Sequence, residues 1–130
     1  MAVSTIKREY ALVSGTISKE TGVTDDSDTR FVNSLHRFGD LVIFQCALQL
    51  SSGAFSTTYT TICTLPSGFR PANNVMTPAV VGTSIWGYNS KAKVYITTDG
   101  TVAIYATANS GAGESASCNH VQFCVAFIGA

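Results

Sequence analysis

The clearest pattern in the chain is the alternation of apolar and polar positions along residues 41–50. One set of alternate positions is wholly apolar: Val42, Phe44, Cys46, Leu48 and Leu50. The other set is mixed: Leu41, Ile43 and Ala47 with Gln45 and Gln49. Because side chains alternate between the two faces of a strand, this period of two predicts a strand with one face on a core. We expect a partner subunit to cover part of the mixed face.

Shorter segments with strand-like composition, separated by turn residues, predict a fold made of strands. Asp99-Gly100 is typical of a tight hairpin turn and joins residues 92–97 to residues 101–105. The other expected strands are residues 10–13, 16–18, 31–38, 56–63, 79–81, 84–88 and 121–128. No segment combines helix caps with a 3.6-residue period. The pattern predicts an all-β fold, an antiparallel β-sandwich of the jelly-roll type.

The domain organisation follows from where this pattern becomes clear. Residues 21–28 are polar and rich in Asp and Thr, which is typical of a loop. We therefore expect residues 1–29 to form an N-terminal linker or shoulder segment and residues 30–130 to form a β-sandwich head domain.

Residues 64–71 predict a sharp corner between strands. Pro66 favours the first central position of a turn, and Gly68 tolerates backbone angles that other residues avoid. Pro71 lacks an N–H group for a ladder and keeps Arg70 extended. We expect this corner to display Phe69 and Arg70, either as a purely structural turn or as part of a recognition surface.

The composition points to association and argues against several partners. Only 12% of the residues are charged while 45% are hydrophobic, so polar groups are too few to cover the surface of a small domain. This predicts a homo-oligomer, and we expect a homotrimer. The eight basic and eight acidic residues cancel and form no basic stripe, so no nucleic-acid partner is expected. The longest apolar run is too short to span a bilayer and residues 1–10 lack an apolar signal core, so neither membrane insertion nor secretion is expected.

Residues capable of catalysis or metal binding are few. The four cysteines, Cys46, Cys63, Cys118 and Cys124, form no CxxC pair, and with two histidines they predict no zinc site. We expect four reduced thiols, with Cys46, Cys63 and Cys124 acting as small core residues. Cys118 lies two positions before His120, but no nucleophile motif surrounds either residue. The sequence therefore predicts neither an enzyme nor a cofactor.

A run of aspartates offers a weak calcium signal. Asp25, Asp26 and Asp28 lack the glycine and the distal glutamate of an EF-hand loop, so a solvated acidic loop is expected.

Two segments are candidates for ligand binding. Trp86, Tyr88 and Asn89 place aromatic rings beside an amide, which suits a saccharide, although Trp86 also suits a core position. The long polar segment before the last strand carries Asn109, Glu114, Asn119 and His120, and it is either a recognition loop or a loop without a ligand.

Three parts of the chain together resemble the C-terminal head domain of a bacteriophage tail-fibre or baseplate receptor-binding protein. They are the sequence Leu65-Pro66-Ser67-Gly68-Phe69-Arg70-Pro71, the hairpin of residues 94–105 and the closing strand of residues 123–130. In such heads a Gly-aromatic-Arg-Pro turn is followed by a hairpin of the form I-x-x-D-G-x-V-x-[IL]-Y and then a final strand. The resemblance covers about residues 30–130.

This resemblance implies a trimeric β-sandwich that binds a host cell-surface saccharide or protein. It also implies tail or baseplate proteins as partners, a location at the tail tip of the virion, and assembly in the host cytoplasm. The alternative is a structural trimerisation or capping domain of a fibre or collagen-like protein without a ligand of its own. A hydrolase is the weakest reading, because no catalytic set is evident.

Overall fold

The computed structural model describes residues 11–83, 90–106 and 118–130, and these residues form ten antiparallel strands and no helix. The all-β, antiparallel prediction is confirmed. The strands are β1 (Val13–Gly15), β2 (Ser18–Lys19), β3 (Val23–Asp25), β4 (Ser34–Phe38), β5 (Leu41–Leu50), β6 (Thr60–Thr64), β7 (Val75–Gly82), β8 (Ser90–Ile96), β9 (Thr101–Ala106) and β10 (His120–Ile128). The strand expected at residues 84–88 lies outside the described residues.

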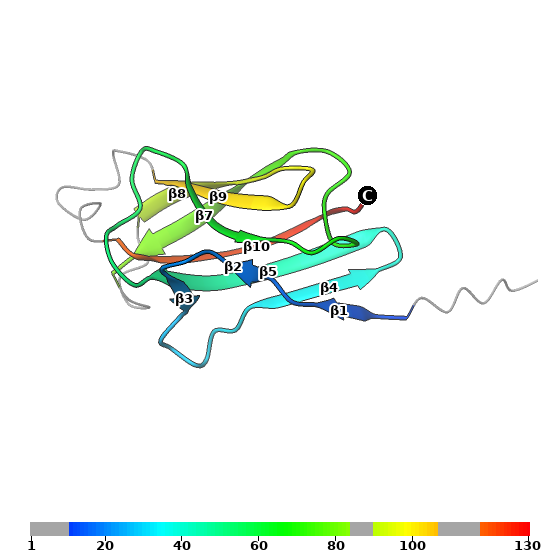
Figure 1. Cartoon of the computed structure of the whole chain (residues 1–130), viewed down its shortest axis with the longest axis horizontal. Coiled ribbons are helices and arrows are strands. Elements are labelled where there is room, and N and C mark those ends of the chain that lie inside the picture. The colour runs from blue at the N-terminus through cyan, green and yellow to red at the C-terminus, as the bar shows by residue number, and fades with distance from the viewer. Residues whose placement is uncertain (1–10, 84–89, 107–117) are drawn as a thin grey trace, which may run out of the picture.

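The strands belong to one curled sheet with the order β1-β4-β5-β10-β7-β8-β9-β6-β2, and β3 pairs with β5 beside β4. Only Thr16 and Ile17 separate β1 from β2, so the first and last strands of the sheet are neighbours in the chain. Moreover, β7 pairs with β10 only through Val80–Gly82. Figure 1 shows the result: β7, β8 and β9 form one half of the curled sheet, and β10, β5, β4 and β1 form the other half.

The core lies inside this curl. All five residues of the apolar set on β5, from Val42 to Leu50, are buried, as the alternation predicts. Phe44 is fully buried, and its ring is nearly perpendicular to that of Phe123 on β10, with 5.2 Å between the centroids. On the opposite face of β5, Leu41 and Ile43 are exposed whereas Ala47 is buried.

Strands also occur where the sequence predicts a loop or a linker. β3 lies within the expected loop of residues 21–28, because Val23–Asp25 pair with the end of β5. In the same segment β1 pairs with β4 and β2 pairs with β6. The described part of residues 1–29 is thus hydrogen-bonded to the sheet, while the expected boundary at residue 29 stays a prediction.

The corner at residues 64–71 turns as predicted, but it does not display Phe69. Gly68 has a positive φ of 90°, which directs the chain back toward the sheet. Phe69 is only 8% exposed, and its ring would lie 2.8 Å from a Cβ placed on Gly15. The expectation that Phe69 is displayed is therefore wrong: the absence of a side chain at Gly15 leaves the space that the ring fills.

Arg37 connects three distant parts of the chain near this corner. Its Nε donates to the carbonyl oxygen of Gly39 at 2.8 Å, in the turn between β4 and β5. One terminal nitrogen donates to the carbonyl oxygens of Gly68 at 2.6 Å and Ala130 at 2.9 Å. Because a guanidinium presents several donors in a fixed plane, a single side chain can join the β4–β5 turn, the corner and the residues that follow β10.

The four cysteines are free thiols in the structure, but they occupy two kinds of environment. Cys46, Cys63 and Cys118 are buried. Desolvation raises the pKa of Cys63 to about 12 and that of Cys46 well above its ordinary value of 9.0. Cys124 is exposed, because on β10 it alternates with the buried residues Phe123 and Val125. The expectation that Cys124 is a core residue is therefore wrong.

We expect the thiols to react accordingly. In native protein at pH 8, a disulfide reagent should modify Cys124 rapidly and the other three cysteines slowly, because burial shields Cys46, Cys63 and Cys118 from the reagent. The raised pKa values of Cys46 and Cys63 slow their reaction further, since the thiolate is the reactive form. After denaturation without reductant, the same titration should count four thiols per chain. A count of two would reveal a disulfide, and rapid loss of all four in native protein would contradict the burial.

Candidate functional site

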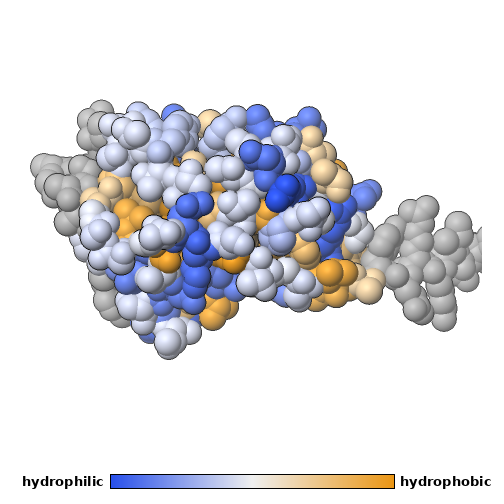
Figure 2. Space-filling view, in the orientation of Figure 1, coloured by the Kyte–Doolittle hydropathy of each residue, from blue (hydrophilic) through white to orange (hydrophobic). Residues whose placement is uncertain are grey.

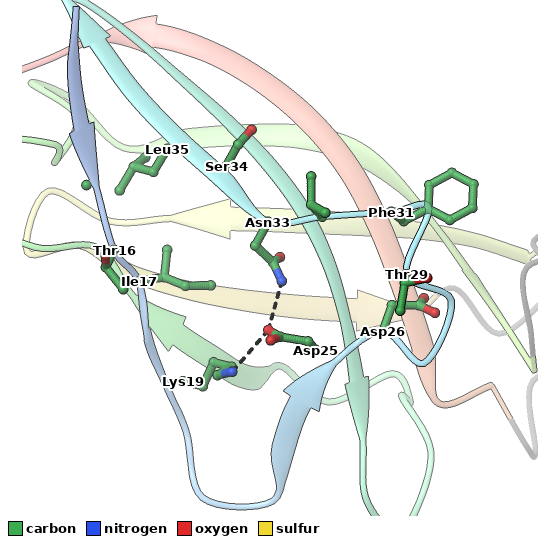
Figure 3. Close-up of a pocket in the computed structure, with 12 residues that line it drawn as sticks. Thr16, Ile17, Lys19, Asp25, Asp26, Thr29, Phe31, Asn33, Ser34 and Leu35 are labelled. Atoms are coloured by element: carbon green, nitrogen blue, oxygen red, sulfur yellow. Dashed lines mark hydrogen bonds and ion pairs between the residues drawn. The ribbon is translucent and has the colours of Figure 1, made fainter.

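An open cleft with a volume of about 440 Å³ lies beside the N-terminal strands. Residues 15–17 and Lys19 line one side, and Asp25, Asp26, Thr29 and residues 31–35 line the other. Figure 3 shows Ile17 and Leu35 among the lining residues, and Asn33 and Lys19 on either side of Asp25. The volume falls in the range of small-molecule sites.

Asn33 takes its position from an interruption in the pairing of β5. β4 pairs with β5 as far as Gln45, and β3 begins to pair at Leu48. The side-chain amide of Asn33 fills this gap, because its Oδ1 accepts from Ala47 N at 2.8 Å and its Nδ2 donates to Ala47 O at 3.0 Å. Asn33 thus replaces a strand neighbour and is fixed at the edge of the cleft.

Asp25 is the centre of the polar wall of the cleft. Its Oδ1 accepts from Lys19 Nζ at 3.0 Å and from Asn33 Nδ2 at 3.1 Å. The side chain of Asp25 stays 69% exposed, so its second oxygen and the remaining ammonium protons of Lys19 can reach a ligand. Because carboxylate and ammonium balance each other, this wall offers both acceptors and donors without net charge. Such a wall, next to the apolar side chains Ile17 and Leu35, suits a neutral molecule with several hydroxyl groups.

The three aspartates that suggest calcium have different partners. Asp25 contacts Lys19, and Asp28 accepts two hydrogen bonds from the Arg30 guanidinium, the shorter at 2.7 Å. These bonds lower the pKa of Asp28 to about 2. Asp26 is buried and lies near His120. Across the ranges 11–83, 90–106 and 118–130, no group of three or more His, Cys, Asp or Glu residues could hold a metal ion.

Asp26 joins the cleft to the beginning of β10. Its Oδ2 lies 3.2 Å from Nδ1 of His120, 94 positions away in the chain, and both residues are buried. Its Oδ1 accepts from the backbone N of Asp28 at 2.9 Å, which shapes the turn after β3. His120, a predicted ligand-binding residue, therefore contacts a residue that lines the cleft, and its role in binding stays a prediction.

Most of the predicted binding residues lie outside the described residues: Trp86, Tyr88, Asn89, Asn109 and Glu114. Of the remaining two, Asn119 is half-buried, and its Nδ2 donates to Leu50 O at 3.4 Å. His120 pairs with Gly82, and Val81 pairs with Ser90, so the residues that flank segment 84–89 lie beside the beginning of β10.

The residues that flank segment 107–117 are hydrogen-bonded to two consecutive residues, Phe55 and Ser56. Phe55 N donates to Cys118 O, and Ser56 O accepts from Ala106 N, both at 2.8 Å. Phe55 is buried, so this anchor belongs to the core. The described residues on both sides of the two predicted binding segments therefore converge on one end of the sheet, and Asp26 links that end to the cleft.

The sequence did not indicate the cleft. Lys19, Asp25 and Asn33 fall in three separate elements, and only the pairing of β2, β3 and β4 with the rest of the sheet brings them together. A Ser–His contact was missed for the same reason: Ser14 Oγ lies 3.2 Å from His36 Nδ1 across the β1–β4 pair. Among the described residues no carboxylate is hydrogen-bonded to His36, so this contact lacks the third member of a catalytic triad.

No protein-family model matches the chain, and no curated protein matches it. Within the described part of the chain, no helix has the length and apolar character needed to cross a membrane.

Proposed function

We propose that this protein is a receptor-binding head domain of a phage tail fibre or baseplate, a jelly-roll-like β-sandwich that assembles as a homotrimer. Its ligand is a host cell-surface saccharide or protein, and it binds without turnover. The observation that carries the proposal is the convergence at one end of the sheet. Asp26 and His120 join this end, where the residues that flank both predicted binding segments lie, to an open cleft with a charge-balanced polar wall.

A saccharide is the ligand class that this end of the sheet favours. Each hydroxyl group of a sugar both donates and accepts hydrogen bonds, as the Asp25–Lys19 pair requires. Loops held on a rigid β scaffold are also the usual place for recognition. Three weak sites on one trimer would reinforce one another on a cell surface through effective concentration.

The assembly is supported by an exposed apolar area on the outer face of β5 and its neighbours, which we call the aliphatic patch. Phe38 lies opposite Leu41, Ile128 lies opposite Leu41 on the other side, and Ala126 lies opposite Ile43. Leu12 directly precedes Val13, which pairs with Arg37, so Leu12 lies next to Phe38. The patch consists of Leu12, Phe38, Leu41, Ile43, Ala126 and Ile128.

The five large side chains of the aliphatic patch are 39–64% exposed. Taking about 200 Å² for each fully exposed, their apolar surface is on the order of 500 Å². This is near the upper end for a monomeric protein, roughly 300–600 Å². Figure 2, which views one face, shows hydrophobic residues in separate patches among hydrophilic ones.

The aliphatic patch also favours the second candidate, a trimerisation or capping domain of a fibre without a ligand of its own. Both candidates predict assembly, so only ligand binding separates them. As a head domain the protein would belong to the virion and contact other tail or baseplate proteins.

Adsorption to cells tests the proposal. Labelled protein incubated with a panel of bacterial strains should bind some strains and not others. The Asp25→Asn variant keeps the size of the side chain but removes the charge that faces Lys19. We expect the affinity for cells to fall about tenfold, which corresponds to about 1.4 kcal/mol of binding free energy. Tyr88→Ala and Asn89→Ala test the segment that the sequence predicts.

Asp40→Asn is the matched control, because Asp40 is exposed in the β4–β5 turn, away from the cleft. It should adsorb like the wild type. If no strain binds, the capping domain is the better reading. If strains bind and all three variants adsorb normally, recognition lies elsewhere on the molecule.

A further inference from the structure

A second exposed cluster, on the other half of the sheet, combines aromatic rings with a cation. In β8 and β9, Lys93 lies opposite Tyr105, and Tyr95 lies opposite Ala103. Tyr59 immediately precedes β6, which pairs with β9. The Tyr59 ring is 5.2 Å from the Tyr105 ring and 6.0 Å from the Tyr95 ring, measured between centroids. We call these three tyrosines with Lys93 the tyrosine platform.

The platform is held in place before any ligand arrives. Tyr95 and Tyr105 are half-buried, and the hydroxyl of Tyr95 accepts from Asn74 Nδ2 at 2.9 Å. Asn74 in turn accepts from Thr98 N at 3.0 Å, which anchors it to the β8–β9 turn. The Tyr59 ring packs at a tilt against both rings and remains 46% exposed. Stacking of a ligand on the platform would therefore cost little side-chain entropy, because the rings are already in position.

The charged residues in the strands of this surface are lysines. Lys91 and Lys93 are exposed on β8, and the sequences of β6, β7, β8 and β9 contain no Asp or Glu. Asp99, in the β8–β9 turn, accepts hydrogen bonds from Thr97 and Thr101. Lys93 Nζ lies 5.3 Å from the centroid of the Tyr105 ring, so a positive charge lies over an aromatic face. The surface is complementary to an anion.

The chemistry of the tyrosine platform differs from that of the aliphatic patch. The patch contains aliphatic side chains and a phenylalanine without a charged group, as the core of a protein interface requires. The platform carries hydroxyl groups and lysines, and lysine is depleted in such interface cores. Aromatic faces stack on the C–H faces of sugar rings, and the tyrosine hydroxyls can bond to sugar hydroxyls. A second copy of the chain therefore fits the patch, and an acidic sugar fits the platform.

We propose that the tyrosine platform binds an acidic saccharide, with one sugar ring stacked on Tyr59 and Tyr105 and its carboxylate at Lys93. This inference rests on the proposed function, because it makes the platform a second contact with the host surface and specifies an acidic sugar as the ligand class there. It does not depend on the cleft.

Calorimetric titration of the full chain with trigalacturonic acid tests the inference, and the methyl-esterified trisaccharide serves as the uncharged comparison. We expect the acid to bind and the ester to bind at least fivefold more weakly. Tyr59→Ala should raise Kd about tenfold, whereas Tyr59→Phe keeps the stacking face and should raise it less than threefold. Lys93→Gln should raise Kd for the acid about fivefold and leave that for the ester unchanged. Asp40→Asn, outside both the cleft and the platform, should change neither.

Several results would overturn the inference. Trigalacturonic acid that does not bind, or that binds Tyr59→Ala as well as the wild type, excludes the platform as its site. A Tyr59→Ala variant with a smaller mass in light scattering would show that the tyrosines form a subunit contact. The strain-adsorption experiment tests the proposed function independently of the platform. If adsorption persists in Tyr59→Ala and falls in Asp25→Asn, the platform is excluded but the proposed receptor-binding function is retained.

Discussion

Replacing Ile43 with glutamate is expected to convert the proposed homotrimer into a monomer. Ile43 lies within the aliphatic patch, opposite His36 on β4 and Ala126 on β10, and is 41% exposed in the protomer. A carboxylate there stays hydrated in the protomer, so the fold should persist. In a trimer that buries the patch, three carboxylates would lose water without a partner, which costs several kcal/mol per interface.

Gel filtration with light scattering measures this effect. The wild type should have three times the protomer mass of 13.7 kDa at micromolar concentration, and Ile43→Glu should have the protomer mass. Val32→Glu is the matched control, since Val32 is 58% exposed and lies outside the patch. It should remain trimeric. A wild-type protein with the protomer mass would remove the trimer from the proposal.

The Phe44→Ala change is expected to have the largest effect on stability. Phe44 is fully buried on β5 and packs edge-on against Phe123. Deleting such a ring leaves a cavity and typically lowers the free energy of unfolding by about 3–5 kcal/mol. Small domains are stable by only roughly 5–15 kcal/mol, so this loss is a large share of the total.

Denaturant unfolding followed by circular dichroism gives the change in the midpoint. Phe44→Leu, which keeps more of the volume, should cost clearly less and provides a measurable variant if Phe44→Ala does not fold. Val32→Ala removes an exposed side chain and should shift the midpoint little. A Phe44→Ala variant with the wild-type midpoint would contradict the assignment of this face of β5 to the core.

The sequence predicts those parts of the fold whose cause is local. The alternation in β5 and the Asp99-Gly100 turn each lie within a few residues, and the structure has β5, β8 and β9 where they indicate strands. Phe69 shows where such reasoning stops. Its burial depends on the space at Gly15, 54 positions earlier in the chain, and no local pattern contains that information.

The cleft could not be predicted for the same physical reason. β3 is a strand only because the far end of β5 offers it a partner, although its own residues, Val23–Asp25, are mostly polar. Asn33 resembles any loop asparagine in the sequence, and it becomes a fixed wall of the cleft only through Ala47. A site that depends on pairing between distant segments can be predicted only when the register of the sheet is known.

An array of bacterial surface glycans, probed with the purified wild-type protein, tests the proposed recognition of a host-surface saccharide. We expect selective binding to a small set of related glycans, with the signal lost on competition by the same glycan in solution. An array without binding above background, obtained with protein shown to be folded and trimeric, would contradict it.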